Sequence, residues 1–339
     1  MKFSNSFLKN KTILVTGGTG SFGQLFVSHI VKKYKEIKKI IVFSRDELKQ
    51  FEMSEKLPMK KFPKIRYFLG DLRDKDRIYR ALDDVNIVIH AAALKQVPKA
   101  EYDPFEYIKT NILGSQNLIE ACLDKKVENV IALSTDKAVT PINLYGATKL
   151  CAEKLFIAAN NIKGWKKIKF SVVRYGNVVG SRGSVIPYFL KQKDKGFLTI
   201  TDEKMTRFTM RLEEAIEMVL WSINRNMGGE IFIPKLPSYR ILDLAKAIGE
   251  NCKIKIIGKR PGEKVDEELI PIQEITNCYD LGKFYSIISN SNHKLKKIYS
   301  SKYKKTNRKT PYTSGNNDHF LDVSEIKNLV LDFSSKENA

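Results

Sequence analysis

Two side chains that can move protons lie four residues apart in the chain, the phenol of Tyr145 and the amine of Lys149. On a helix this spacing places both side chains on one face, one turn apart. A phenol is a poor base near neutral pH, and a neighbouring ammonium group favours its ionised form. Such a pair is a weak signal by itself, because it more often consists of two surface residues. Its meaning depends on the residues around it.

A polar triplet comes shortly before this pair. Thr135, Asp136 and Lys137 follow the apolar segment 128–133, which predicts a strand. An acid beside an amine can supply a proton donor and a proton acceptor to one substrate. The alternative is a surface salt bridge after the strand. The surrounding motifs favour the catalytic interpretation.

A glycine-rich turn near the N-terminus predicts a dinucleotide site. It follows the apolar segment 12–16 and opens a helical segment that runs to Tyr34. Glycines permit a tight turn and close approach to a pyrophosphate, which rests on the helix N-terminus. The alternative is a glycine-rich loop without a ligand. The residues of this turn that we expect to contact a cofactor are Gly17, Thr19, Gly20, Ser21, Phe22 and Gly23.

The end of the second predicted strand, 39–43, bears on the choice of cofactor. An acid there binds the ribose 2′-hydroxyl of NAD, and an arginine accepts the 2′-phosphate of NADP. Ser44, Arg45 and Lys49 favour NADP, whereas Asp46 keeps NAD open. Residues after the next two strands are expected beside the adenine and the nicotinamide ribose: Asp71, Leu72, Ala91, Ala92, Ala93 and Lys95. His90 ends an apolar strand and is interpreted as a structural histidine.

Strands that alternate with helical segments predict an α/β fold with a Rossmann-like, doubly wound parallel sheet. The predicted strands cover residues 12–16, 39–43, 64–69, 86–90, 128–133 and 168–173. Shorter elements in the second half predict a smaller α/β substrate-binding lobe over the sheet's carboxyl edge. We expect that lobe to include a helix over 212–226 and a strand over 230–233. The predicted division is 1–175 for the dinucleotide-binding domain, 176–285 mainly for the lobe, with some segments returning to the first domain, and 286–339 for a basic C-terminal extension.

The net charge of +21 is high for a chain of 339 residues. Eight basic residues and no acid lie within 291–310. No aromatic-interleaved nucleic-acid motif accompanies them, so we expect a lysine-rich surface that attracts anionic ligands or, weakly, an anionic membrane, and no nucleic acid. We find no apolar run of membrane-spanning length and no signal peptide, and four scattered cysteines indicate reduced thiols and no metal site. A cytoplasmic protein is expected.

As a set, these motifs resemble those of the extended short-chain dehydrogenase/reductases, and specifically the inverting UDP-N-acetylglucosamine 4,6-dehydratases of pseudaminic acid biosynthesis. The motifs lie at residues 16–23, 44–47, 90–95, 133–138 and 145–149, and continue through 174–177, 180–184, 205–208 and 260–264. The resemblance covers about residues 8–270. The basic stretch 291–310 departs from the family's pattern.

The resemblance implies a closed redox cycle on UDP-N-acetylglucosamine with bound, recycled NADP. Hydride leaves C4 of the sugar, and the 4-keto group acidifies the C5 proton. Water is then lost across C5 and C6, hydride returns to C6, and C5 is reprotonated on its opposite face. The implied product is UDP-2-acetamido-2,6-dideoxy-β-L-arabino-hex-4-ulose, a precursor for surface glycans such as those of flagellin. A homo-oligomer, from dimer to hexamer, is also implied.

The resemblance assigns roles to five residues. Tyr145 is the base at the C4 hydroxyl, Lys149 activates Tyr145 and orients the cofactor ribose, and both contact the cofactor. Thr135 hydrogen-bonds the 4-hydroxyl, and Asp136 is the general acid for water loss. Lys137 is the base at C5, once burial or nearby positive charge has lowered its pKa. The residues expected to bind substrate are Lys95, Asn177, Arg182, Thr199, Met205, Arg207, Arg260 and Glu263.

Other functions stay open. A UDP-sugar 4-epimerase of this fold would use the same cofactor but needs no acid for water loss, so Asp136 and Lys137 argue against it. Retaining dehydratases that resemble this family carry an Asp-Glu pair there. A non-catalytic NADP-binding sensor would not need to keep Tyr145, Lys149, Asp136 and Lys137 together.

Overall fold

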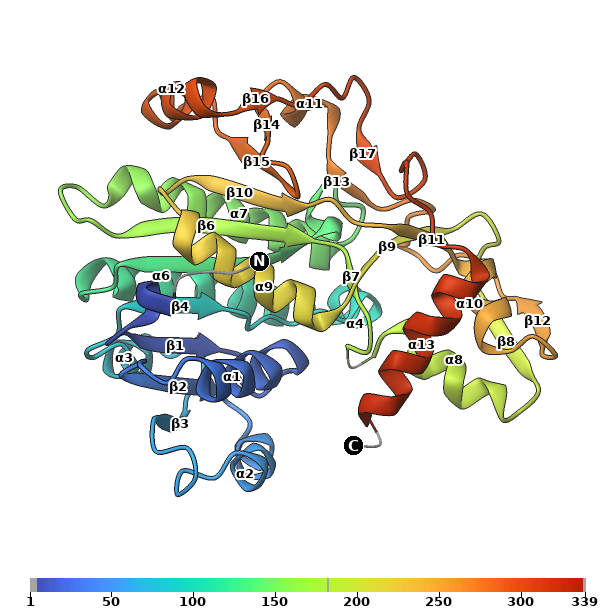
Figure 1. Ribbon diagram of the computed structural model, residues 1–339, viewed down its shortest axis with the longest axis horizontal. Helices are drawn as coiled ribbons and strands as arrows, with labels where there is room; N and C mark the ends of the chain where they lie inside the picture. The colour runs from blue at the N-terminus through green and yellow to red at the C-terminus, as the bar shows by residue number, and fades with distance from the viewer. Residues whose placement is uncertain (1–4, 182, 338–339) are drawn as a thin grey trace.

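A ten-stranded sheet forms the centre of the protein in the computed structural model, which describes residues 5–181 and 183–337. Its strand order is β16-β14-β15-β10-β6-β5-β4-β1-β2-β3 (Figure 1). The seven strands from β3 to β10 run parallel. At the other edge, β15, β14 and β16 are each antiparallel to their neighbours. The strands are β1 Thr12–Thr16, β2 Lys39–Ser44, β3 Ile65–Leu69, β4 Ile87–His90, β5 Asn129–Thr135, β6 Lys169–Tyr175, β10 Glu230–Pro234, β14 Cys278–Asp280, β15 Phe284–Ile288 and β16 Lys304–Lys305. The predicted doubly wound parallel sheet is confirmed.

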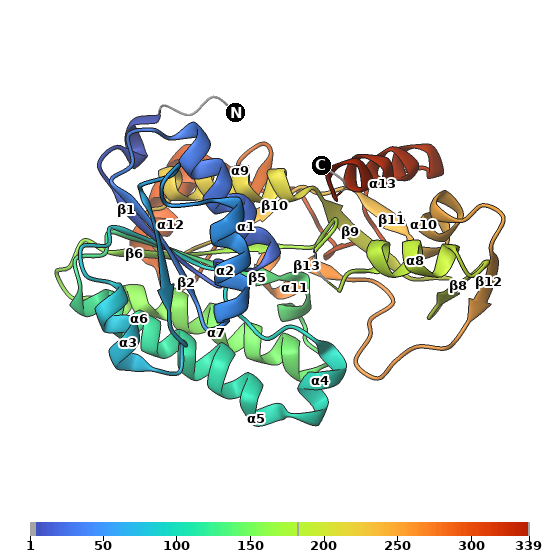
Figure 2. The same ribbon diagram turned by 90° about the horizontal axis from the view of Figure 1, so that it is seen from below.

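Helices cover both faces of this sheet (Figure 2). One face carries α1 Ser21–Lys33, α2 Glu47–Lys56 and α9 Leu212–Arg225, and the other carries α3 Lys75–Ala81, α6 Gly114–Asp124 and α7 Leu144–Ile162. The short helices α4 Val97–Tyr102 and α5 Pro104–Tyr107 and a π-helical turn, Ile108–Leu113, lead into α6. A parallel strand covered on both faces is buried along its whole length and mostly apolar, as β1 is, with three apolar residues between two buried threonines. This is why the apolar runs located these strands.

Two segments expected in the smaller lobe belong to the large sheet instead. Helix α9 packs against α1, and β10 pairs in parallel with β6, where Ile231 lies beside Val172. All five residues of β10 are buried. The expectation that 212–226 and 230–233 cover the carboxyl edge is therefore wrong, because these segments are buried as part of the sheet's own layers.

The smaller lobe lies beyond the carboxyl ends of the parallel strands, on the right in Figure 1. Its strands are β7 Asn177–Val178, β8 Phe197–Ile200, β9 Thr206–Met210, β11 Ser238–Arg240 and β12 Lys253–Ile256, and its helices are α8 Val185–Lys193, α10 Ile241–Ile248 and α13 Val323–Glu337. Phe189, Leu198, Leu244 and Ile326 meet in its apolar core. The lobe therefore has a core separate from the two layers of the large sheet.

The residues expected as one basic extension, 286–339, divide between the two bodies. β15, α12 His293–Lys302 and β16 extend the large sheet, where Tyr299 of α12 packs against Tyr279. β17 Tyr312–Thr313 pairs with β13 Glu268–Ile270, which precedes α11 Ile272–Ile275, and α13 packs against α10. The C-terminal part of the chain thus joins both bodies. The basic stretch lies on the large sheet, away from the lobe.

The amino ends of the parallel strands form what we call the lysine-rich edge. Lys39 begins β2, Lys169 begins β6, and Lys11 and Lys64 directly precede β1 and β3. Exposed lysines of the adjoining loops are Lys38, Lys60, Lys61, Lys126 and Lys167. Because the strands are parallel, this edge lies at the end of the sheet opposite the lobe. Across residues 5–181 and 183–337, no helix is both long enough and apolar enough to cross a bilayer.

Candidate active site

A cavity of about 1050 Å³ lies at the carboxyl ends of the parallel strands, where the lobe meets the sheet. Its lining includes these expected cofactor contacts: Gly17, Thr19, Gly20, Ser21, Phe22, Gly23, Ser44, Arg45, Asp46, Lys49, Asp71, Leu72, Ala91, Ala92, Ala93 and Lys95. It also includes Thr135, Lys137, Tyr145, Lys149, Asn177, Thr199, Met205, Arg207, Arg260 and Glu263. Arg182 lies outside the described residues. The structure thus places every predicted residue at the cavity wall except Asp136 and Arg182. The roles of these residues stay predictions.

The glycine turn between β1 and α1 suits an anion. Gly17 has φ +65°, and a Cβ there would lie 2.8 Å from the Cα of Ala92, so a side chain does not fit. Helix α1 begins at Ser21, and its N-cap residue is Gly20, which has no side chain to cap it. The backbone N–H groups and the helix dipole at this end favour negative charge. A pyrophosphate fits the chemistry of this turn.

The polar groups at the end of β2 are already paired. The Thr19 and Ser44 hydroxyls lie 2.8 Å apart, and Arg45 lies 3.7 Å from Asp71. Asp46 caps α2 by accepting from the Lys49 backbone N–H at 3.0 Å, and its carboxylate also pairs with the Lys49 amine. Asp46 thus has a structural role in the helix cap, and the guanidinium of Arg45 is half exposed at the cavity.

Tyr145 and Lys149 lie in the first turns of α7, as the spacing predicted. Asn143 caps this helix by accepting from the Gly146 N–H at 2.8 Å, and it donates to the Gly262 carbonyl at 2.8 Å. A Cβ on Gly146 would lie 2.1 Å from the Lys137 carbonyl oxygen. Glycine here therefore lets α7 approach the turn that follows β5, and this contact brings Tyr145 close to Lys137.

Burial acts in opposite directions on these two side chains. It lowers the pKa of Lys149 to about 8, and the amine donates to the Leu133 carbonyl at 2.8 Å. Burial also raises the pKa of Tyr145 to about 12, against a lowering effect from Lys137 and from a hydrogen bond with Thr135. The pKa of Tyr145 is therefore raised by burial, and not lowered overall as expected for a phenol beside an ammonium.

Asp136 lies beneath the cavity and is fully buried in the 3-10 turn Asp136–Ala138. Its Oδ1 accepts from the Thr135 hydroxyl at 3.0 Å and from the Lys137 amine at 3.1 Å. Its Oδ2 is buried without a hydrogen-bond partner among the described residues. Burial raises the pKa of Asp136 above its ordinary value, despite the Lys137 ammonium. A carboxyl group with a raised pKa suits a proton donor.

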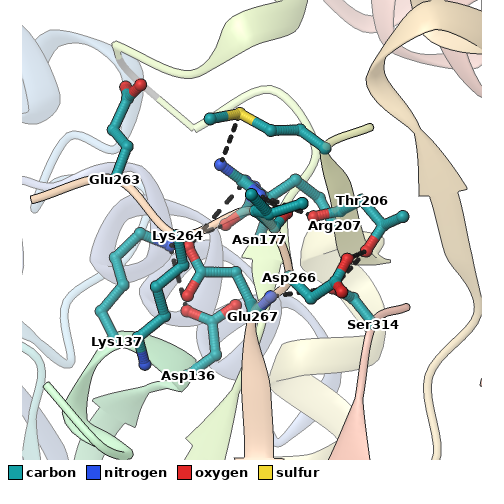
Figure 3. Close-up of polar contacts among 12 residues, drawn as sticks. Asp136, Lys137, Asn177, Thr206, Arg207, Glu263, Lys264, Asp266, Glu267 and Ser314 are labelled. Carbon is teal, nitrogen blue, oxygen red and sulfur yellow. Dashed lines mark hydrogen bonds and ion pairs between the residues drawn. The ribbon is translucent and has the colours of Figure 1, made fainter. Parts of the chain in front are cut away.

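Glu267 is a further carboxylate at this site that the sequence did not reveal. It is 3% exposed, and its Oε1 lies 3.1 Å from the Lys137 amine (Figure 3). Lys137 also donates to Asn177 Oδ1 at 3.3 Å. Burial alone would lower the pKa of Lys137, but Asp136 and Glu267 outweigh it and raise the pKa. The expected lowering is wrong, because Lys137 lies between two carboxylates. The only signal in the sequence is the acidic run 266–268, which also fits an ordinary surface.

The predicted substrate residues differ in their surroundings. Arg207 is buried and donates to the Val265 carbonyl at 2.9 Å, with Nε 3.9 Å from Glu267, whereas Arg260 is exposed. Thr199 accepts from the Gln192 side chain at 2.9 Å. Much of the hydrogen-bonding capacity of Arg207 is thus used within the protein. Arg260 is the better placed of these two arginines to meet a diphosphate.

His90 and Asn111 have structural surroundings. The His90 ring lies 2.8 Å from the Thr16 hydroxyl and 3.3 Å from that of Ser115, and burial lowers its pKa to about 3. Asn111 accepts from the Leu94 N–H at 2.8 Å and donates to the Thr148 hydroxyl at 3.0 Å. His90 is thus a neutral core residue, and Asn111 links α7 to the loop that follows β4.

A Rossmann-like sheet, a glycine turn at its carboxyl edge and a Tyr-x-x-x-Lys pair in α7 define an extended short-chain dehydrogenase/reductase. The model of the polysaccharide biosynthesis protein family matches residues 13–289. The chain belongs to this family.

Similar proteins carry two different activity names. A UDP-N-acetylglucosamine 4,6-dehydratase (inverting) of Campylobacter jejuni is 49% identical and covers 94% of this chain and 97% of its own. A UDP-glucose 4-epimerase of Rickettsia bellii is 44% identical and covers 95% of this chain and 96% of its own. The X-ray structure of Pen from Bacillus thuringiensis aligns with a TM-score of 0.88 at 37% identity, over 97% of this chain and 99% of the other.

Proposed function

We propose that the protein is an NADP-dependent UDP-N-acetylglucosamine 4,6-dehydratase, a hydro-lyase that inverts C5. One observation carries the proposal: a buried acid, Asp136, and an amine, Lys137, are hydrogen-bonded beside the Tyr145 phenol. This arrangement provides for proton transfer at C4 and, separately, for the loss of water. The dehydratase name of a relative at 49% identity supports it.

The surroundings of Tyr145, Asp136 and Lys137 determine which proton each of them can transfer. The oxygen of Tyr145, hydrogen-bonded to Thr135, takes the proton of the 4-hydroxyl after the phenol, whose pKa is about 12 in the resting protein, has released its own proton to water in the cavity. Burial raises the proton affinity of Asp136 above that of an exposed aspartate, so its carboxylate can accept the proton that Lys137 releases and pass it to the leaving 6-hydroxyl. Lys137 is protonated at rest, so it can take the C5 proton only after it has released its own. When bound, the cofactor accepts hydride from C4 and returns it to C6.

NADP is the better fit at the end of β2. Arg45 is half exposed at the cavity and lies 3.7 Å from Asp71, while Asp46 is used by the cap of α2 and by Lys49. A 2′-phosphate would give Arg45 and Lys49 a second anionic partner. Titration with NADP and NAD by calorimetry tests this choice, and tighter binding of NAD would contradict it.

A UDP-sugar 4-epimerase is the second candidate, because a relative with that name is 44% identical over nearly the same length. An epimerase requires hydride removal and return at C4, for which Tyr145 and Lys149 suffice. It has no use for a buried acid that donates a proton to a leaving group. Asp136 is therefore the residue whose presence favours the dehydratase.

The test is an incubation of the protein with UDP-N-acetylglucosamine and catalytic NADP in heavy water, followed by mass spectrometry and NMR. Loss of one water, one deuterium at C5, an inverted C5 and no net NADPH are expected. An unchanged mass with an inverted C4 would identify an epimerase. Tight cofactor binding without any turnover would identify a sensor.

Several further properties rest on the resemblance and on the relative's name. We infer that the product serves pseudaminic acid biosynthesis, that the enzyme is a homo-oligomer, and that it works in the cytoplasm. The domain boundaries near residues 175 and 285 also stay predictions. Gel filtration with light scattering tests the oligomer, and a monomer at micromolar concentration would contradict it.

A further inference from the structure

We propose that Glu267 is a positioning residue that, together with Asp136, holds Lys137 as an ammonium ion in the resting protein. Lys137 then begins the reaction protonated, and Glu267 decides how readily its amine becomes free. The catalytic meaning of this inference rests on the proposed function. Its direct test measures the ionisation of Lys137 and requires no turnover.

The geometry places Lys137 between two carboxylates from distant parts of the chain. The Lys137 amine lies 3.1 Å from Asp136 Oδ1 and 3.1 Å from Glu267 Oε1. The two acids are 0% and 3% exposed. At such depth the effective dielectric constant is low, so each carboxylate acts strongly on the ammonium. Lys137 itself is partly open, with a side chain 24% exposed at the cavity.

Glu267 also has an oxygen that the protein leaves without a partner. Its Oε2 is buried and lacks a hydrogen bond among the described residues, as does Asp136 Oδ2. A buried carboxylate kept only for stability usually has its oxygens satisfied, because an unpaired one costs free energy. Glu267 lines the cavity as a residue, while this oxygen itself is covered. This is the pattern of a functional carboxylate.

The other charged and titratable groups near Lys137 do not share this effect. They are Arg207, Lys95, Lys264, Tyr145 and Tyr239. The three cations among them repel the Lys137 ammonium and favour loss of its proton, and the two tyrosines are neutral near pH 7. Of the described groups around Lys137, Asp136 and Glu267 are thus the ones that retain the proton.

The backbone around Glu267 is held on several sides. Its N–H donates to the Ser314 hydroxyl at 2.9 Å, and the Ser314 N–H donates back to its carbonyl at 2.8 Å. Two residues on, the Leu269 carbonyl accepts from Arg174 at 2.9 Å, and Arg174 also pairs with Glu153 of α7 at 2.7 Å. The carboxylate is therefore fixed relative to the helix that carries Tyr145.

Neighbouring side chains fasten the same segment to the turn that carries Lys137. Lys264 donates to the Val139 carbonyl at 2.5 Å, and Thr140 donates to Glu268 at 2.8 Å. Figure 3 shows Lys264 and Glu267 of this segment beside Asp136 and Lys137. Glu268 offers a matched control, because it is an adjacent carboxylate that accepts a hydrogen bond from Thr140, whereas Glu267 pairs with Lys137.

The test measures the ionisation of Lys137 directly. Full-length wild-type, Glu267→Gln, Glu267→Asp and Glu268→Gln proteins are labelled with trace acetic anhydride from pH 7 to 11.5, and acetylation of Lys137 is quantified by mass spectrometry. Only the free amine reacts. Removing the charge at 267 should move the Lys137 labelling curve toward lower pH by about one to three units. The curves of Glu267→Asp, which keeps the charge, and of Glu268→Gln should stay near the wild type.

Two results would overturn the inference. One is a Glu267→Gln curve that superimposes on the wild-type curve, and the other is an equal shift in Glu267→Asp, which would show that charge is not the cause. Melting temperatures and the labelling of surface lysines establish that each variant is folded. Wild-type protein with this labelling pattern but no dehydratase activity would refute the proposed function and leave the inference standing.

If the wild type turns over, pH profiles of kcat/KM add a second readout. The limb that reports Lys137 should move to lower pH in Glu267→Gln, with KM within about threefold, since a one-unit shift changes the amine fraction about tenfold. A rate that falls equally at every pH would mean a merely structural loss and would contradict the inference.

Discussion

Lys137 and Lys149 show how neighbours decide what a buried amine can do. Lys137 follows β5 and Lys149 lies in α7, and burial by itself acts to lower the pKa of each. Lys149 donates to a backbone carbonyl, so its pKa falls to about 8. Lys137 meets Asp136 and Glu267, and its pKa rises. Two residues of the same type thus have opposite readiness to release a proton.

Replacing Tyr145 by Phe removes the hydroxyl that we assign to the C4 proton. Since positioned acid–base groups contribute roughly 10²–10⁴-fold, kcat should fall by about that factor with little change in KM. Product formation followed by mass spectrometry measures kcat, and calorimetry measures nucleotide-sugar binding. A loss below about tenfold would assign the C4 proton to another group.

Lys149→Met should change how the stability of the cofactor-free protein depends on pH. The pKa of Lys149 is about 8 in the folded protein, against an ordinary 10.5. Below pH 8 the amine is charged in the folded protein, and burial of this charge lowers the free energy of unfolding. That cost disappears as the pH rises from about 8 to 10.5, because the unfolded chain then binds more protons than the folded one.

Urea unfolding of both proteins at several pH values measures this term. The stability of Lys149→Met relative to the wild type should be greatest below pH 8 and decline toward pH 10.5 by up to about 3 kcal/mol. The lost hydrogen bond to Leu133 contributes a constant offset that does not vary with pH. A difference that is the same at pH 7 and pH 10 would contradict the assignment.

At the scale of elements, the site is assembled where α7, the turn after β5 and the segment 264–270 meet. Gly146 of α7 contacts the Lys137 carbonyl, and Asn143 at its N-cap holds the Gly262 carbonyl. Arg174 of β6 joins Glu153 of α7 to Leu269. The groups that we propose as catalytic thus depend on contacts among these three elements.

Gly146→Ala should disrupt this junction. The added Cβ would lie 2.1 Å from the Lys137 carbonyl oxygen, so the turn that carries Asp136 and Lys137 must move. A shift of about 1 Å at reacting groups costs on the order of 10²-fold in rate. Dehydratase assays and melting curves measure both effects. Ala147→Gly is the control, with a helix-propensity cost of about 1 kcal/mol and little loss of rate.

Sequence patterns located the elements better than they located their partners. The apolar runs predicted the first six strands because the parallel strands inside the sheet are buried on both faces and therefore mostly apolar, and the edge strand β3 still carries apolar residues on its buried side. The sequence predicts the strand 230–233 correctly but places it in the smaller lobe, because the residues of a strand do not show that it pairs with β6. Glu267 was missed, and the pKa of Lys137 was misjudged, for the same reason. Contacts between distant segments decide both.

At the scale of the whole molecule, the lysine-rich edge and the cavity lie at opposite ends of the parallel strands. The lysine-rich edge gathers at the amino ends of the parallel strands, and the cavity lies at their carboxyl ends. An anionic surface attracted to that edge would therefore leave the cavity accessible. The direction of the parallel strands is the reason for this separation.

The lysine-rich edge should dominate binding to anionic surfaces. Replacing Lys126 and Lys167 by Gln should lower the salt concentration at which the protein elutes from a cation exchanger, because such binding is screened by salt. Replacing the exposed lobe residues Lys195 and Lys204 is the control and should have a smaller effect. Equal shifts in both double variants would mean that the charge acts as a whole and not through this edge.

The support that Ser314 gives Glu267 has a consequence for biosynthesis. A ribosome makes the chain from its N-terminus, so the glycine turn, Tyr145 and Lys137 emerge long before β17. The strand β17, next to the Ser314 that steadies Glu267, and the helix α13 that completes the lobe core emerge only after all of these groups. A nascent chain therefore holds most of its reactive groups without the segment that sets their arrangement. The arrangement of the site is therefore complete only after β17 and Ser314 have emerged.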